Sequence, residues 1–150
     1  MEEFVMYENH CPKQEIRDFG GEPFAASIER ITEANQTYRT ALWTGNQLQV
    51  TVMSIPVSGD IGLEIHPHTD QFIRIENGCA LAVMGKRKDA LNFRQKITGG
   101  FAVIIPAGTW HNIINIGNTP LKLYSIYAPV QHPFGTVQQT KKIAEIEESR

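Results

Sequence analysis

Residues 100–115 read GFAVIIPAGTWHNIIN, an apolar run, a Pro-x-Gly turn and a histidine that opens a second apolar run. The first run is rich in β-branched residues, which favour a strand. Pro106 and Gly108 suit a tight turn, because proline presets a negative φ and glycine accepts a positive one. We therefore expect two strands joined by this turn, with His111 at the start of the second strand.

The same pattern recurs along the chain, as short runs rich in Ile, Val, Thr and Tyr separated by Gly, Pro and Asn. Such spacing is typical of an antiparallel sandwich or barrel. Only the tail, about 140–148, has a helical pattern, with Thr140 as its expected N-cap. The expected strands are 25–31, 37–43, 47–55, 62–66, 71–76, 79–84, 91–97, 101–105, 111–116 and 121–127.

The length and composition predict one soluble domain. A chain of 150 residues with 41% hydrophobic and 20% charged residues has the size and balance of a single globular core. We expect one domain over 1–150, with an N-terminal arm over about 1–23, a barrel core over about 47–129 and the C-terminal helix. The chain has no apolar stretch of membrane-spanning length and no basic secretory start, so we expect a cytoplasmic protein with no membrane partner.

The charge distribution argues against nucleic-acid binding. A formal net charge of -2 leaves no large basic field to neutralise phosphates. The dense basic cluster Lys86-Arg87-Lys88 lies between two expected strands and is interpreted as a solvated turn. The expected partner is therefore a small molecule.

Residues 100–115 fit the pattern G-x5-P-x-G-x2-H-x3-N without a mismatch. This pattern is the second motif of the cupin superfamily, and the chain resembles that superfamily over about 47–129. The resemblance implies an all-β fold, the double-stranded β-helix or jelly-roll barrel, here with a short C-terminal helix. It also implies a metal site at one barrel end and a homodimer. Within the superfamily the chain looks like the small single-domain bacterial cupins labelled mannose-6-phosphate isomerase-like.

The first cupin motif, G-x5-H-x-H-x3,4-E-x6-G, is matched by residues 59–78 with departures. Gln71 stands in the place of the glutamate ligand. In one register His66 and His68 form the H-x-H pair, but the spacing to Gln71 is one residue short. In the other register Glu64 and His66 take that place, and the spacing fits.

Pro67 favours the second register. Proline lacks the amide hydrogen for a ladder bond, so a strand that ends at His66 and a turn that begins at Pro67 are expected. The ligand set implied by the resemblance is Glu64, His66, Gln71 and His111, with His68 as the alternative to Glu64.

Imidazole nitrogens with carboxylate and amide oxygens suit a divalent ion such as Fe, Mn, Ni, Co or Zn. Glutamine in place of glutamate removes one negative charge, which leaves the ion a stronger Lewis acid. This favours a sugar or hydroxy-carbonyl isomerase or lyase, with Glu64 or His68 as the catalytic proton carrier. The alternatives are a non-haem iron or nickel dioxygenase and a non-catalytic small-molecule-binding protein.

Overall fold

The computed structural model describes residues 14–149. The expected N-terminal arm lies partly outside this range, and residues 14–23 form no helix or strand. The described elements are α2 (Ile28–Ala34), β1 (Arg39–Thr44), β2 (Gln49–Ile55), β3 (Asp70–Asn77), β4 (Cys79–Gly85), β5 (Phe93–Thr98), β6 (Ala102–Ile105), β7 (Trp110–Asn115), β8 (Leu121–Ala128), β9 (Val137–Gln138) and α3 (Lys141–Glu148).

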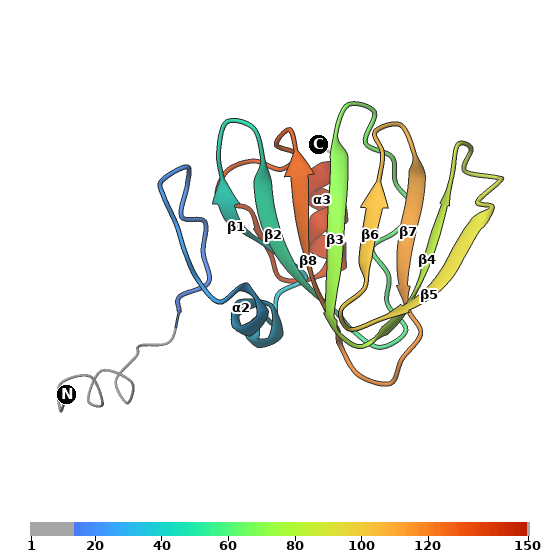
Figure 1. Cartoon of the computed structure of the whole chain (residues 1–150), viewed down its shortest axis with the longest axis horizontal. Helices are drawn as coiled ribbons and strands as arrows, with labels where there is room; N and C mark the ends of the chain where they lie inside the picture. Colours follow the sequence, from blue (N-terminus) through green and yellow to red (C-terminus); the bar gives the residue numbers. More distant parts are fainter. Residues whose placement is uncertain (1–13, 150) are drawn as a thin grey trace.

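Two antiparallel sheets build the fold (Figure 1). The larger sheet has the strand order β6-β3-β8-β2-β1-β9, and the smaller has the order β5-β4-β7. This arrangement is a cupin-type jelly roll with a short C-terminal helix, as the sequence predicted. Thr140 caps α3 by accepting a hydrogen bond from the Ile143 amide at 3.2 Å.

Buried and exposed side chains alternate along β3. Gln71, Ile73 and Ile75 are buried between the sheets, whereas Arg74 is exposed on the other face. Ile113 on β7 belongs to the same core cluster, so residues of both sheets fill the interior. The core therefore lies next to the end of the barrel where both β3 and β7 begin.

Two expected strands were wrong, and one short strand was not predicted. The strand expected over 25–31 is replaced by α2, because Ser27 accepts a hydrogen bond from the Arg30 amide and starts a helix that packs Ile28 and Ile31 on the larger sheet. The segment 62–66 forms only a single bridge pair, since Gly62 has a φ of 87° and interrupts the strand. The two-residue strand β9 carried no sequence signal.

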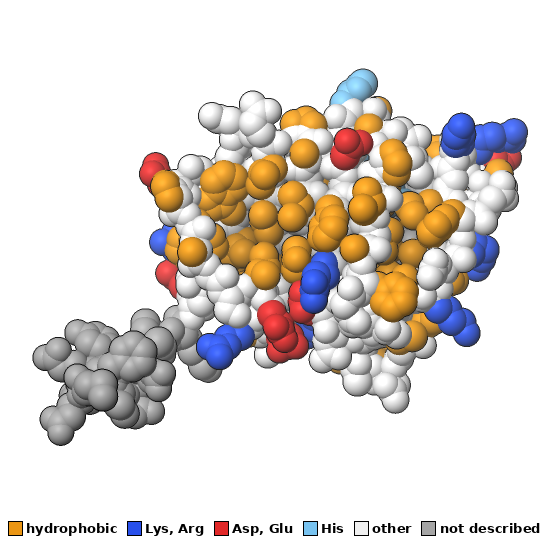
Figure 2. All heavy atoms as spheres, viewed as in Figure 1, with side chains coloured by type: hydrophobic (Ala, Val, Ile, Leu, Met, Phe, Trp, Pro, Cys, Tyr) orange, Lys and Arg blue, Asp and Glu red, His pale blue; other side chains and the backbone are white. Residues whose placement is uncertain are grey.

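The outer face of the larger sheet is only partly covered. Ile16, Phe19 and α2 pack over one part of it. Figure 2 shows apolar side chains gathered over the rest of this face, along β2, β8 and β3. In the range 14–149, no helix is both long and apolar enough to cross a membrane.

Candidate metal centre

Three of the predicted ligands meet inside the barrel. Ligand atoms of Glu64, His66 and His111 all lie within 4.8 Å of one another. The Oε1 atom of Glu64 is 3.4 Å from His66 Nε2 and 3.5 Å from His111 Nε2. Both histidine side chains are buried, so the cluster is sheltered from bulk water.

Backbone pairing explains this convergence. The Glu64 amide donates to the His111 carbonyl at 3.0 Å, and the His111 amide donates to the Glu64 carbonyl at 2.9 Å. These two bonds place the Glu64 segment beside the start of β7. The side chains of a directly opposed pair project to the same face, so Glu64 and His111 face each other across the site.

The turn between β6 and β7 holds both histidines. The Gly108 amide donates to the His66 carbonyl at 2.9 Å, and Gly108 has the positive φ, 78°, that its glycine predicts. The Thr109 carbonyl lies 2.9 Å from His111 Nδ1, so it accepts the Nδ1 proton. With the proton on Nδ1, the lone pair of His111 Nε2 is free to bind a metal ion.

Several ligand-type atoms at the site lack a partner. His66 Nε2, His111 Nε2 and Gln71 Oε1 are buried without a hydrogen bond in the part of the chain that the structure describes. The Gln71 side-chain nitrogen donates to Ser125 Oγ at 3.3 Å, so the Gln71 Oε1 atom points away from Ser125. An unpaired buried polar atom costs about 1–3 kcal/mol, so three of them call for a ligand. Nitrogen and oxygen donors of this kind fit a borderline divalent ion.

The two alternative ligands, Glu64 and His68, lie in different surroundings. Glu64 belongs to the group, whereas His68 is exposed in the turn that starts at Pro67 and is not part of it. This is the arrangement that the second register predicts. Gln71 lies at the start of β3 with its side chain buried between the sheets.

Electrostatics keep the carboxylate ionised. Burial favours the protonated form of Glu64, but the approach of the His111 and His66 rings and the charge of Arg39 outweigh it. Together they hold the pKa of Glu64 well below its usual range. Glu64 is therefore ready to bind a cation at neutral pH without first releasing a proton.

A further histidine faces the same space. The ring of His132 lies edge-on to Tyr127 at 5.1 Å, and Tyr127 lies 5.8 Å from the His66 ring. Burial and the nearby charge of Arg39 lower the pKa of His132 to about 3, so its ring is neutral at physiological pH. His132 lies in the loop after β8, outside both cupin motifs.

Gln49 fixes the position of His132. Its side-chain oxygen accepts the His132 amide at 2.9 Å, and its side-chain nitrogen donates to the His132 carbonyl at 2.9 Å. Gln49 and His132 are 83 residues apart, and neither lies in one of the two cupin motifs. No local pattern in the sequence signals this contact.

A pocket of about 410 Å³ opens at the metal cluster. Glu64, His66 and His132 line it from the barrel, and Glu147 and Glu148 line it from α3. None of the described residues that line it is a lysine or an arginine. The pocket wall is thus acidic, which disfavours phosphate or carboxylate groups on a ligand.

Buried Arg39 lies behind this wall. Its Nη1 donates to Gln138 Oε1 at 2.7 Å and to Glu148 Oε1 at 3.1 Å. Glu148 Oε1 is also 3.8 Å from His132 Nδ1. The guanidinium of Arg39 therefore holds α3 against the barrel and does not face a ligand in the pocket.

Comparison with known proteins identifies the family. The Cupin_2 domain model matches residues 51–127, slightly more than half of the chain. The chain belongs to the Cupin_2 family. This cupin is 60% identical over 126 residues to the uncharacterised protein YrkC of Bacillus subtilis, which covers 84% of the chain and 68% of YrkC.

Two other relatives extend the comparison. The cupin is 44% identical to the uncharacterised protein L612 of Acanthamoeba polyphaga mimivirus, over 76% of the chain and 70% of that protein. The crystal structure of BH2720 from Bacillus halodurans superposes with a TM-score of 0.87 at 58% identity, covering 87% of this chain and 99% of that chain. The fold and the family are thereby shown.

Proposed function

We propose that this cupin binds one divalent metal ion through Glu64, His66 and His111, with Gln71 as a further oxygen ligand, and acts as an isomerase or lyase on a neutral hydroxy-carbonyl compound. The observation that carries the proposal is the meeting of three ligand atoms within 4.8 Å beside buried, unpaired polar atoms. A bound divalent ion would polarise the carbonyl or hydroxyl oxygen of the substrate.

The protein's own side chains would orient the substrate beside the ion. His132 lines the same pocket as Glu64 and His66, and its Nε2 has no hydrogen-bond partner within residues 14–149. A neutral imidazole with a free nitrogen accepts a hydrogen bond from a substrate hydroxyl, but a pKa of about 3 makes His132 too weak a base to take a proton from carbon. The sequence candidates for proton transfer are Glu64 and His68. Glu64 lines this pocket, whereas His68 is exposed in the turn and does not.

The acidic pocket wall supports a substrate without phosphate. Glu147 and Glu148 line the mouth, and Glu147 accepts a hydrogen bond from the Gln138 amide at 3.1 Å. Such amide and carboxylate groups bind hydroxyl or amino groups through hydrogen bonds. A sugar phosphate would place its dianion beside these carboxylates, so the mannose-6-phosphate isomerase-like label is not part of the proposal.

A non-haem iron or nickel dioxygenase is the second candidate. Two histidines and one carboxylate form the ligand set that non-haem iron oxygenases use. Metal content and oxygen dependence separate the two candidates. The protein is purified under exclusion of air and without chelator, and its metal content is measured by elemental analysis.

Zinc or manganese at about one equivalent, with turnover of neutral hydroxy-carbonyl compounds in the absence of oxygen, would support the isomerase or lyase. Iron at that level with oxygen consumption would support the dioxygenase instead. Ligand affinity without turnover under both conditions would leave a non-catalytic binding protein. A site that refuses added metal would overturn the proposal as a whole.

We also propose that the protein is a homodimer formed through the outer face of the larger sheet. Phe72, Tyr124 and Ile126 are half-buried on strands of this sheet, beside the Arg74–Glu76 ion pair at 2.9 Å. A two-fold axis at this face would let the ion pair meet its symmetry mate. Light scattering tests it, and a monomeric mass would overturn it. The cytoplasmic location stays a prediction from the sequence.

A further inference from the structure

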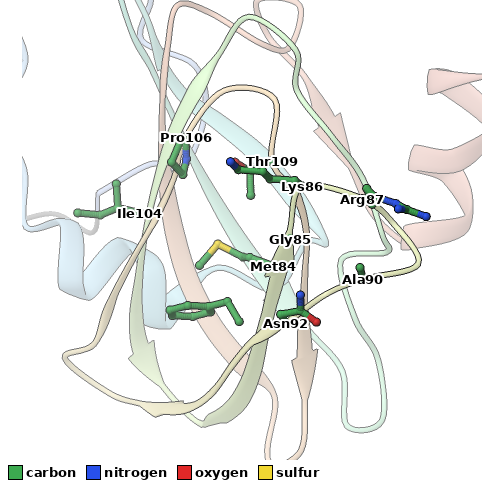
Figure 3. Close-up of a pocket in the computed structure, with 10 residues that line it drawn as sticks. Met84, Gly85, Lys86, Arg87, Ala90, Asn92, Ile104, Pro106 and Thr109 are labelled. Carbon is green, nitrogen blue, oxygen red and sulfur yellow. The ribbon is translucent and has the colours of Figure 1, made fainter.

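A second pocket lies on another side of the barrel, away from α3. Its volume is about 630 Å³, within the range of small-molecule sites. It is lined by residues of β5 and β6, each an edge strand of its own sheet, and these two strands are not hydrogen-bonded to each other. Figure 3 shows it between these strands, with the Met84 side chain directed into the space.

The interior of this pocket is apolar. Met84 and Ala90 line it from β4 and the loop that follows, and Phe93, Ile104 and Pro106 line it from the two edges. Ile104 is 66% exposed and Phe93 is 49% exposed, so both present apolar area to water. A ligand that covers these side chains removes that area from water, which favours an apolar group.

The rim of the pocket carries positive charge. Lys86 and Arg87 line it, and no carboxylate is among the residues that do. Arg87 is paired with Asp89 at 2.9 Å and points away from the pocket in Figure 3. Lys86 makes no ion pair or side-chain hydrogen bond with any residue in the range 14–149, so its charge is available to an anion.

The pocket also contacts the turn that holds the metal histidines. Pro106 and Thr109 line it, and they bound the turn between β6 and β7. The Thr109 carbonyl accepts the His111 Nδ1 proton, and the Gly108 amide donates to the His66 carbonyl. A ligand in the pocket therefore touches the segment that positions both histidines of the metal cluster.

We infer that this pocket binds an amphipathic anion, an apolar chain or ring that ends in a carboxylate, and that its occupancy changes the metal affinity of the Glu64, His66 and His111 cluster. The apolar body lies against Met84 and Ile104. The carboxylate lies at Lys86. The effect on metal binding is transmitted through the turn at 106–109, and it works in both directions because binding linkage is reciprocal.

Octanoate is the probe, with octanol and octylamine as neutral and cationic ligands of the same chain length. Titration calorimetry on the metal-free protein measures the binding half of the inference. We expect octanoate to bind more tightly than octanol and octylamine to bind most weakly. Equal affinities for the three ligands, or no binding of octanoate, would overturn the carboxylate assignment.

Two variants locate the site, and both change exposed side chains that the core does not need. Lys86→Gln is expected to weaken octanoate binding about two- to fivefold, the size of an exposed charge contact. Ile104→Glu is expected to weaken it about tenfold or more, through lost apolar contact and charge repulsion. The matched controls are Lys142→Gln and Ile146→Glu on α3, at exposed positions. Equal losses in the controls would place octanoate elsewhere.

The coupling between the two sites is measured by comparing the apparent Zn²⁺ affinity with and without saturating octanoate. A change of about fivefold or more is expected, and Ile104→Glu should abolish it. Octanoate binding with an unchanged Zn²⁺ affinity would overturn the coupling. Because the calorimetry uses metal-free protein, it tests octanoate binding even if the proposed metal site binds no metal.

Discussion

Replacing Glu64 by glutamine keeps the size of the side chain and removes the carboxylate from the group that it forms with His66 and His111. Its Oε1 lies 3.4 and 3.5 Å from the two imidazole nitrogens, so this oxygen is in position to share an ion with them. Loss of an outer-shell partner of a metal ligand costs about 10–100-fold in affinity. Loss of a charged ligand should therefore cost about 100-fold or more.

This loss translates into a thermal shift. At a free metal concentration 100 times the dissociation constant, binding stabilises the wild-type protein by about 2.7 kcal/mol. A 100-fold weaker variant would gain only about 0.4 kcal/mol under the same conditions. For a domain of this size, about 1 kcal/mol moves the melting temperature by about 2–4 °C. We expect a rise of about 5–11 °C for the wild type and about 1 °C for Glu64→Gln.

The assay is thermal unfolding followed by circular dichroism, with and without Zn²⁺, after treatment with chelator. The matched control is His68→Gln, which changes an exposed residue of the neighbouring turn and should keep the full wild-type shift. A full shift in Glu64→Gln together with a lost shift in His68→Gln would refute the register argument. Comparing shifts rather than absolute melting temperatures removes any effect of either substitution on the metal-free protein.

Three further predictions concern stability and are tested by urea unfolding. His132 stays neutral in the folded protein, because burial lowers its pKa to about 3, while the unfolded chain binds this proton below about pH 6.5. The free energy of unfolding therefore falls by about 2 kcal/mol between pH 7 and pH 5 because of this group. His132→Asn should remove this part of the pH dependence of the free energy of unfolding, whereas the control His68→Asn should leave it unchanged. An unchanged pH dependence in His132→Asn would show that it arises from other groups. Leu123→Ala should cost about 2–5 kcal/mol, because the side chain is fully buried between the sheets, and a smaller loss would mean that the core relaxes around the gap. Thr140→Ala should cost about 1 kcal/mol through loss of the α3 cap, and no change would mean that the helix is held by its packing alone.

Local patterns predicted much of the fold because their causes are local. The turn at Pro106 and Gly108 follows from the φ preferences of two residues, and the alternation of β3 follows from its period of two. Pro67 similarly indicated where the strand-like segment ends, and the structure places Glu64 rather than His68 beside the two histidines. Each of these inferences needed fewer than ten residues of sequence.

The surroundings of the site were not predictable in this way. Arg39 contacts Glu148 across 109 residues, and Gln49 holds His132 across 83 residues. Such pairs are chosen by the topology, which brings β1, β9 and α3 together, and not by any spacing along the chain. The helix α2 was missed for another reason, since a short apolar run of Ile28 and Ile31 fits a strand or a helix until its packing is known.

The wall of the acidic pocket depends on α3, a helix of eight residues near the end of the described chain. Its hold on the barrel includes the ion pair of Glu148 with Arg39. Short helices held to a barrel by a few contacts open locally at a lower free energy than core strands do. The metal cluster is built on backbone pairs of the barrel and would persist through such an opening. Local opening of α3 would then widen the mouth, so the rate at which a bulky molecule enters or leaves reflects how firmly this helix is docked.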